Sequence, residues 1–91
     1  MNKKDKKLYN QISKAYKTLP ADADDGLRQL LLDNGTALKK GADYRDVSVK
    51  LASHLDHYLL LSKSLPTAVT DLADDVEVTA NKYRGAVGSA S

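Results

Sequence analysis

The residues of this chain whose types could carry out chemistry include two histidines. His54 and His57 stand three positions apart, so on a helix they would occupy adjacent positions of one turn and could share a metal ion. A third ligand would have to come from elsewhere, because the chain has no cysteine and no His-Glu-x-x-His motif. We therefore predict no metal site and no cofactor, with His54 beside the core and His57 in solvent.

The arginines and hydroxyl residues give no stronger case for catalysis. A nucleophilic triad would have to use serine or threonine, and none stands in a recognisable nucleophile elbow. Arg28, Arg45 and Arg84 could form an anion pocket between helices, as in small helical mutases. Because Arg28 and Arg45 lie outside the apolar stripes, we predict scattered surface arginines, no small-molecule substrate and no enzymatic activity.

The start of the chain is basic, with Lys3, Lys4, Lys6 and Lys7 in the first seven residues. These lysines could contact nucleic acid or an anionic lipid surface, or they could form a solvated, disordered lead-in. The net charge of +2 is small for a nucleic-acid-binding protein, and only Tyr9 supplies an aromatic ring nearby. We expect the lead-in and no nucleic-acid partner.

Four amphipathic segments must position these residues. In each segment apolar residues recur three and four positions apart, as on one face of a helix. The predicted helices are residues 5–18, 24–40, 44–62 and 66–83. Short connections join them, and no segment alternates with period two. The sequence therefore predicts an all-α fold, an antiparallel up-down-up-down four-helix bundle.

Seven aliphatic residues on these stripes are expected in the core: Leu30, Leu31, Leu51, Leu55, Leu59, Leu72 and Val76. Tyr58 and Tyr83 also lie on apolar stripes, which more often indicates core than binding site. Residues 1–84 should form one domain. Residues 85–91 are small and glycine-rich, so we expect a flexible tail there.

Capping residues mark the ends of the predicted helices. The candidates for the N-caps are Asp24 or Asp25 for the second helix, Asp43 or Asp46 for the third, and Ser64 for the fourth. Gly41 can take the left-handed conformation that ends the second helix. Asp33-Asn34-Gly35 reads locally as a turn and could divide that helix into two. We favour a continuous helix, because Leu38 stays in phase with the leucines before the tripeptide.

We predict no segment of the sequence to cross a membrane. Its longest purely apolar run is four residues, Tyr58 to Leu61, whereas a spanning helix needs about 20. The basic start is not followed by the apolar segment of a signal peptide. We expect a soluble protein that stays in the cytoplasm.

The remaining features are short segments in a fixed order. A Lys-rich start leads into Leu8-Tyr9-Asn10, Leu38-Lys39-Lys40-Gly41 is followed by Tyr44, the third helix carries Val49, Leu51, Leu55 and Tyr58, and the fourth segment holds Leu65-Pro66, Asp71-Leu72 and Lys82-Tyr83-Arg84-Gly85. In the order and spacing of these features, over about residues 7–85, the chain resembles the immunity proteins of the enterocin A family. The resemblance implies a cytosolic four-helix bundle that protects lactic acid bacteria from pediocin-like bacteriocins. It implies, as partner, the membrane components of the mannose phosphotransferase system together with the bacteriocin.

In that family the C-terminal half tends to decide which bacteriocin is recognised. The tail after Arg84 is shorter here than in some relatives, so we expect recognition by the third and fourth helices. The residues predicted to bind the partner lie off the apolar stripes: Arg45, Lys50, His57, Lys63, Asp74, Lys82 and Arg84. The lysines at the start could hold the protein weakly near the anionic inner leaflet. The alternative is a small helical nucleic-acid-binding or regulatory interaction module.

Overall fold

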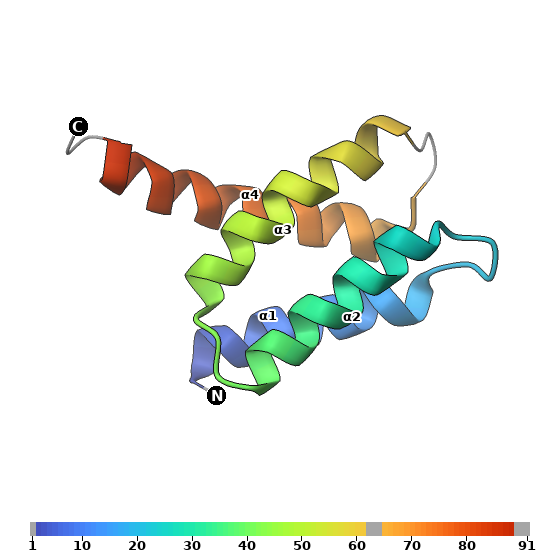
Figure 1. Ribbon diagram of the computed structural model, residues 1–91, viewed down its shortest axis with the longest axis horizontal. Helices are drawn as coiled ribbons and strands as arrows, with labels where there is room; N and C mark the ends of the chain where they lie inside the picture. The colour runs from blue at the N-terminus through green and yellow to red at the C-terminus, as the bar shows by residue number, and fades with distance from the viewer. Residues whose placement is uncertain (1, 62–64, 89–91) are drawn as a thin grey trace.

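The computed structural model describes residues 2–61 and 65–88, with the side chains of α4 described as far as Tyr83. Over these residues the chain forms helices and no strand. The helices are α1 (Lys3–Thr18), α2 (Asp25–Lys39), α3 (Tyr44–Leu61) and α4 (Thr67–Gly88). Each helix runs antiparallel to the one before it (Figure 1). The predicted all-α four-helix bundle is confirmed.

The helices pack as two pairs. α1 and α2 lie side by side, whereas α3 and α4 cross one another (Figure 1). α4 also packs on α1, and α2 on α3, while α1 and α3 contact each other least. The C-terminal end of α4 extends beyond the body of the other helices (Figure 1). Within the described ranges no helix has the length and apolarity needed to cross a membrane.

The core between the helices is aliphatic. Five of the seven residues expected there are buried: Leu31, Leu51, Leu55, Leu72 and Val76. Leu30 and Leu59 are only half-buried, because they lie at the edges of stripes that are wider than the area each helix covers. Tyr58 is half-buried, and Tyr83 is 38% exposed, so the prediction of a core role for Tyr83 is wrong. Tyr83 lies in the C-terminal half of α4, whose end extends beyond the other helices (Figure 1).

Asn2 caps α1, since its side-chain oxygen accepts the backbone N–H of Asp5 at 2.8 Å. α1 therefore begins at Lys3, two residues earlier than predicted, and the early lysines belong to the first turns of a helix. The expectation of a disordered lead-in is wrong over these residues. An uncapped start would leave the first backbone N–H groups without acceptors, and Asn2 supplies one.

Aspartates cap the next two helices. The Asp24 carboxylate accepts the N–H groups of Gly26 and Leu27 at 2.7 and 3.3 Å, which settles the choice between Asp24 and Asp25. Asp43 precedes α3 and accepts the N–H of Arg45 at 2.8 Å, which selects Asp43 over Asp46. Ser64, predicted to cap α4, lies outside the described residues.

α2 is continuous through Asp33-Asn34-Gly35, as favoured from the sequence. The side chain of Asn34 is buried and donates to the carbonyl of Leu30 at 2.8 Å. Gly35 is buried against α1, where a Cβ would lie 3.4 Å from Cγ2 of Ile12. The turn-forming residues therefore serve the helix contact between α1 and α2.

Gly41 ends α2 in the predicted left-handed conformation, with φ of 106°. Its N–H donates to the carbonyl of Leu38 at 3.0 Å, and the N–H of Ala42 donates to that of Ala37 at 2.9 Å. This pair of bonds is a Schellman motif, which satisfies two of the last carbonyls of the helix.

α4 is longer than predicted, since it continues to Gly88 and not to residue 83. The backbone of residues 85–88 is therefore helical, although these residues were expected to belong to the tail. Residues 89–91 lie outside the described range. A formed helix gains one backbone hydrogen bond with each added residue, and no proline stops it here.

Candidate partner-binding groove

Lysines from the basic start of the chain and one lysine predicted for partner binding meet at one end of the bundle. There the N-termini of α1 and α3 and the C-terminal half of α4 enclose an open groove of about 350 Å³. Lys4 and Lys7 of α1, Tyr44 of α3, and Asp75, Val78 and Lys82 of α4 line it. We call this feature the α1/α3/α4 groove. It joins residues from both ends of the sequence.

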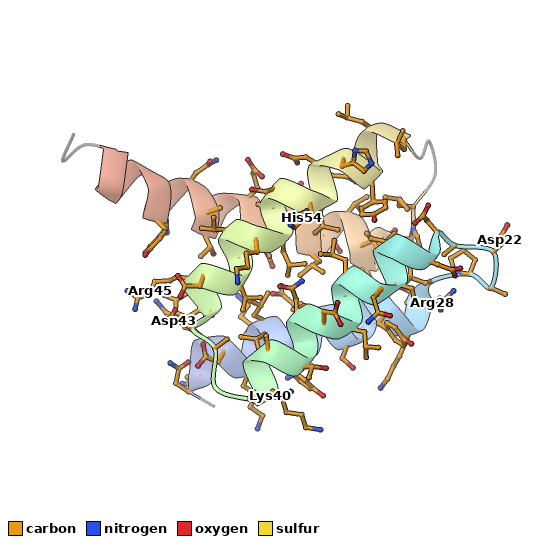
Figure 2. All side chains as sticks on the ribbon, viewed as in Figure 1. Asp22, Arg28, Lys40, Asp43, Arg45 and His54 are labelled. Carbon is orange, nitrogen blue, oxygen red and sulfur yellow. The ribbon has the colours of Figure 1, made fainter. Side chains whose placement is uncertain are left out.

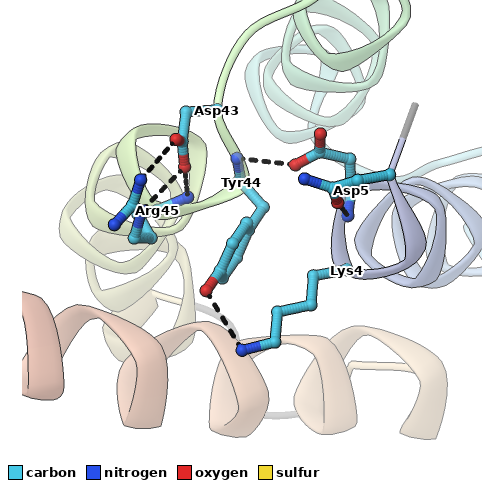
Figure 3. Close-up of polar contacts among 6 residues, drawn as sticks. Lys4, Asp5, Asp43, Tyr44 and Arg45 are labelled. Atoms are coloured by element: carbon cyan, nitrogen blue, oxygen red, sulfur yellow. Dashed lines mark hydrogen bonds and ion pairs between the residues drawn. The ribbon is translucent and has the colours of Figure 1, made fainter.

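Tyr44, the first residue of α3, is the centre of the polar contacts beside the groove (Figure 3). Its backbone N–H donates to a carboxylate oxygen of Asp5 at 3.0 Å. Its hydroxyl accepts from Nζ of Lys4 at 3.4 Å, and that ammonium lies 5.5 Å from the ring centroid. The guanidinium carbon of Arg45 lies 5.9 Å from the same centroid, so the ring contacts two cations.

Arg45 is held by Asp43. Nη2 of Arg45 donates to Oδ2 at 2.8 Å, Nε donates to Oδ1 at 3.1 Å, and the backbone N–H donates to Oδ1. The side-chain bond and then the backbone bond lower the pKa of Asp43 from its ordinary 3.8 to about 2. The same pairing raises the pKa of Arg45. Both groups are therefore charged and engaged with each other at neutral pH.

The lysines of the groove have no such partner. Over residues 2–61 and 65–83 the one pair of opposite charges within 4.0 Å is Arg45 with Asp43. Lys4, Lys7 and Lys82 thus present their ammonium groups without a carboxylate in contact. The acid of the groove, Asp75, accepts a hydrogen bond from the side-chain amide of Gln11 across the α1–α4 contact. The charged residues that line the groove give it a net charge of +2.

The other residues predicted to bind the partner do not gather at the groove. Lys50, His57 and Asp74 are exposed on α3 and α4, outside the groove lining. Lys63 lies outside the described residues. Arg84 lies in α4, but its side chain is outside the description. Of the residues predicted for partner binding, Lys82 therefore lines the groove and Arg45 stands beside Tyr44.

The four lysines at the start of the chain also lie on different surfaces. Lys4 and Lys7 face the groove, whereas Lys3 and Lys6 are exposed and do not line it. One helix thus presents lysines both to the groove and to another surface.

Both histidines are exposed (Figure 2 labels His54). The prediction that His54 flanks the core is wrong, because the buried face of α3 includes Ser48 and Ala52 and turns His54 outward. His57 contacts Tyr58 edge to face, with ring centroids 5.4 Å apart. In the described part of the chain, no three or more histidine or acidic side chains come together as a metal site would require.

Arg28 and Arg45 lie at opposite ends of the molecule and cannot share one anion pocket (Figure 2). Arg28 instead donates to the carbonyl of Pro20 at 2.8 Å and lies 6.0 Å from the ring of Tyr16. Arg28 is half-buried and links α2 to the segment that follows α1.

The contact between Asp5 and Tyr44 was not predicted from the sequence, where Tyr44 entered only through the family resemblance. Asp5 stands among lysines and reads as an ordinary first-turn acid, and its hydrogen-bond acceptor role joins positions 39 residues apart. Two features of the sequence pointed toward this contact. Asp5 is a carboxylate among lysines, and the predicted start of the third helix has backbone N–H groups that need an acceptor.

Comparison with known proteins agrees with the resemblance found in the sequence. The model of a bacteriocin immunity protein family matches residues 3–81, from the start of α1 well into α4. The Hiracin-JM79 immunity factor of Enterococcus hirae is 34% identical over 83 residues, which cover 90% of this chain and 87% of that protein. No solved structure matches. The family match spans most of the chain, and with the four-helix fold it leads to one conclusion: this chain belongs to the bacteriocin immunity protein family.

Proposed function

We propose that this protein protects its cell from a pediocin-like bacteriocin by binding, from the cytosol, the toxin-occupied mannose phosphotransferase permease. The observation that carries the immunity function is the family match over residues 3–81. The similarity to an immunity factor over 90% of the chain supports it. The permease and the cytosolic site of action come from the resemblance in the sequence.

The proposed mode of action is binding and not catalysis. Many polar contacts of the described residues cap helices or join them, as those of Asp24, Asp43 and Asp5 do, and others lie within one helix, as that of Gln29 with Asp33 does. Such contacts stabilise the helical scaffold. The surface of that scaffold carries the charged residues proposed for recognition: Arg45, Lys50, His57, Lys63, Asp74, Lys82 and Arg84. Lys3 and Lys6 remain available for weak contact with the inner leaflet.

The immunity function is tested by expressing the gene in a sensitive strain and challenging it with a panel of pediocin-like bacteriocins. At least one member should lose potency relative to a strain that carries the empty vector. Immunoblotting and circular dichroism of the purified protein should establish that it is present and helical. Unchanged potency of every member of the panel under these conditions would refute the immunity function.

The partner is tested by affinity capture from detergent-solubilised membranes, with and without the cognate bacteriocin. The mannose permease should be retained in a toxin-dependent manner, and a strain lacking the permease should serve as control. Retention that is equal with and without toxin would contradict recognition of the occupied permease.

The part of the chain that determines specificity is tested by exchange. Residues 44–91 are replaced by those of a relative that protects against a different bacteriocin. The range of protection should follow these residues. Specificity that stays with residues 1–43 would rule out recognition by α3 and α4.

A further inference from the structure

We infer that the α1/α3/α4 groove is the docking site for an acidic segment of a protein partner, whose carboxylates are bound by Lys4, Lys7 and Lys82. The inference rests on the proposed function in so far as the segment belongs to the target that immunity requires. The binding chemistry itself is argued from the charges and shape of the groove.

The first argument is charge. Lys4 and Lys7 lie one turn apart on α1, and Lys82 reaches the same groove from α4. Three ammonium groups face one carboxylate, that of Asp75. Groups that share a cleft raise the local potential more than groups spread over a convex surface. The complementary ligand carries at least two negative charges.

The second argument is that the acids near the groove already have hydrogen-bond partners, whereas its lysines have no carboxylate partner. Asp75 accepts from Gln11, Asp5 accepts the Tyr44 N–H, and Asp43 is paired with Arg45. These three acids therefore have acceptor roles within the fold, while the exposed Asp46 in the first turn of α3 does not line the groove. Along the described residues, Lys7 and Lys82 have no carboxylate within ion-pair distance, so an incoming carboxylate displaces no ion pair.

The third argument is the apolar surface beside the lysines. Val78 is 56% exposed and stands one turn before Lys82 on α4. Buried Leu8 and Val76 underlie the groove. A segment with an apolar side chain next to its carboxylates can cover Val78 and reach the lysines at the same time. This pattern is that of an amphipathic acidic peptide.

The shape favours a protein segment over a membrane. The groove is concave, and its volume of about 350 Å³ lies near the lower end of the range for ligand pockets. A bilayer contacts a convex face, and the lysines suited to it are Lys3 and Lys6, which do not line the groove. The two sets of lysines can therefore be tested separately.

The probe for the test is a synthetic helical peptide with glutamates four residues apart and leucines between them, titrated into the ¹⁵N-labelled full chain. Shift changes should be confined to the start of α1, Tyr44 and the second half of α4. The pair Lys7→Glu/Lys82→Glu should weaken the peptide Kd about tenfold or more. The matched pair Lys14→Glu/Lys17→Glu alters exposed lysines outside the groove and should change it less than about twofold.

Several results would overturn the inference. These are no binding by the wild-type chain, shift changes elsewhere, or equal weakening by both variant pairs. Displacement of the peptide by phosphatidylserine vesicles, combined with loss of vesicle binding in Lys7→Glu/Lys82→Glu, would show that the groove is a membrane site. Lys7→Gln/Lys82→Gln should give a smaller loss in the same direction if the charge-reversed pair does not fold.

The protection assay separates this inference from the proposed function. If the wild type protects and Lys7→Glu/Lys82→Glu, folded and present, protects equally, the groove inference fails and immunity stands. If the wild type protects against no bacteriocin of the panel, the proposed function fails, and the peptide titration alone decides whether the groove binds acidic segments.

Discussion

The carboxylate of Asp5 on α1 accepts a hydrogen bond from the backbone N–H of Tyr44, the first residue of α3, at 3.0 Å (Figure 3). The first N–H groups of a helix have no acceptor within the helix. Asp43 serves the N–H of Arg45, and Asp5 serves the one before it from a different helix. α1 and α3 otherwise contact each other little, so this bond and the longer one from Nζ of Lys4 to the Tyr44 hydroxyl link the two helices.

Replacing Asp5 should therefore weaken the start of α3. We expect Asp5→Ala to lower the free energy of unfolding by about 1 kcal/mol, as loss of a helix cap does, measured by urea denaturation. The amide of Tyr44 should also exchange faster with solvent. Asp22→Ala removes an exposed acid at the opposite end and should have little effect (Figure 2). Equal effects of the two substitutions would contradict the cap.

The pairing of Asp43 with Arg45 predicts a specific pH dependence. The pKa of the Asp43 carboxyl in the folded protein is about 2, below the ordinary 3.8, so folding favours the ionised form of Asp43. The stabilising contribution is present above pH 3.8 and is lost as the pH falls through about 2. A carbon-detected NMR titration of the Asp43 carboxyl should show this midpoint. Arg45→Gln should return the midpoint toward 3.8, and a wild-type midpoint already near 3.8 would contradict the pairing.

Stability should depend on the buried face of α3 and not on its exposed end. Leu55 is fully buried, so Leu55→Ala should cost about 2–5 kcal/mol in the free energy of unfolding. Leu60 is 87% exposed on the same helix, and Leu60→Ala should change that energy by less than about 0.5 kcal/mol. Chemical denaturation of both variants tests the pair. Similar losses would mean that the α3 face is assigned wrongly.

Gly26 and Tyr58 should be energetically coupled. A Cβ at Gly26 would overlap the Tyr58 hydroxyl and lie 2.9 Å from Oδ1 of Asp24. Gly26→Ala should therefore destabilise the protein by about 1–3 kcal/mol. In a Tyr58→Phe background the same substitution should cost less, since the obstructing oxygen is gone. A double-mutant cycle by thermal or urea unfolding measures the difference, and a coupling energy of zero would show that Tyr58 does not occupy this space.

Most of the fold could be predicted because its signals are local. Asp24, Asp43 and Gly41 act within three residues of a helix end, so their roles can be read from the chain. The end of α4 was placed too early because Gly85 and the small residues after it favour a tail by composition, whereas the backbone stays helical to Gly88. His54 was placed beside the core because spacing alone gives the phase of a stripe only to within a side chain or so.

The polar junction and the groove could not be predicted in the same way. The bond from Tyr44 to Asp5 depends on which end of α1 lies beside the start of α3. The meeting of Lys7 with Lys82 depends on α4 packing on α1. These are consequences of helix pairing, which amphipathic periods do not specify. The sequence identifies the lysines as candidates, but their proximity in the folded protein cannot be predicted from it.

The boundary between residues 43 and 44 has a consequence for building hybrids of two immunity proteins. Both acids that serve the start of α3, Asp5 and Asp43, lie in the N-terminal half. They accept backbone N–H groups, which any incoming C-terminal half supplies unless it has proline at position 44 or 45. A recipient that keeps both acids can therefore accept foreign versions of α3 and α4 with this junction intact. Position 45, in contrast, comes from the incoming C-terminal half. A hybrid without arginine at this position keeps both backbone hydrogen bonds and loses only the ion pair with Asp43.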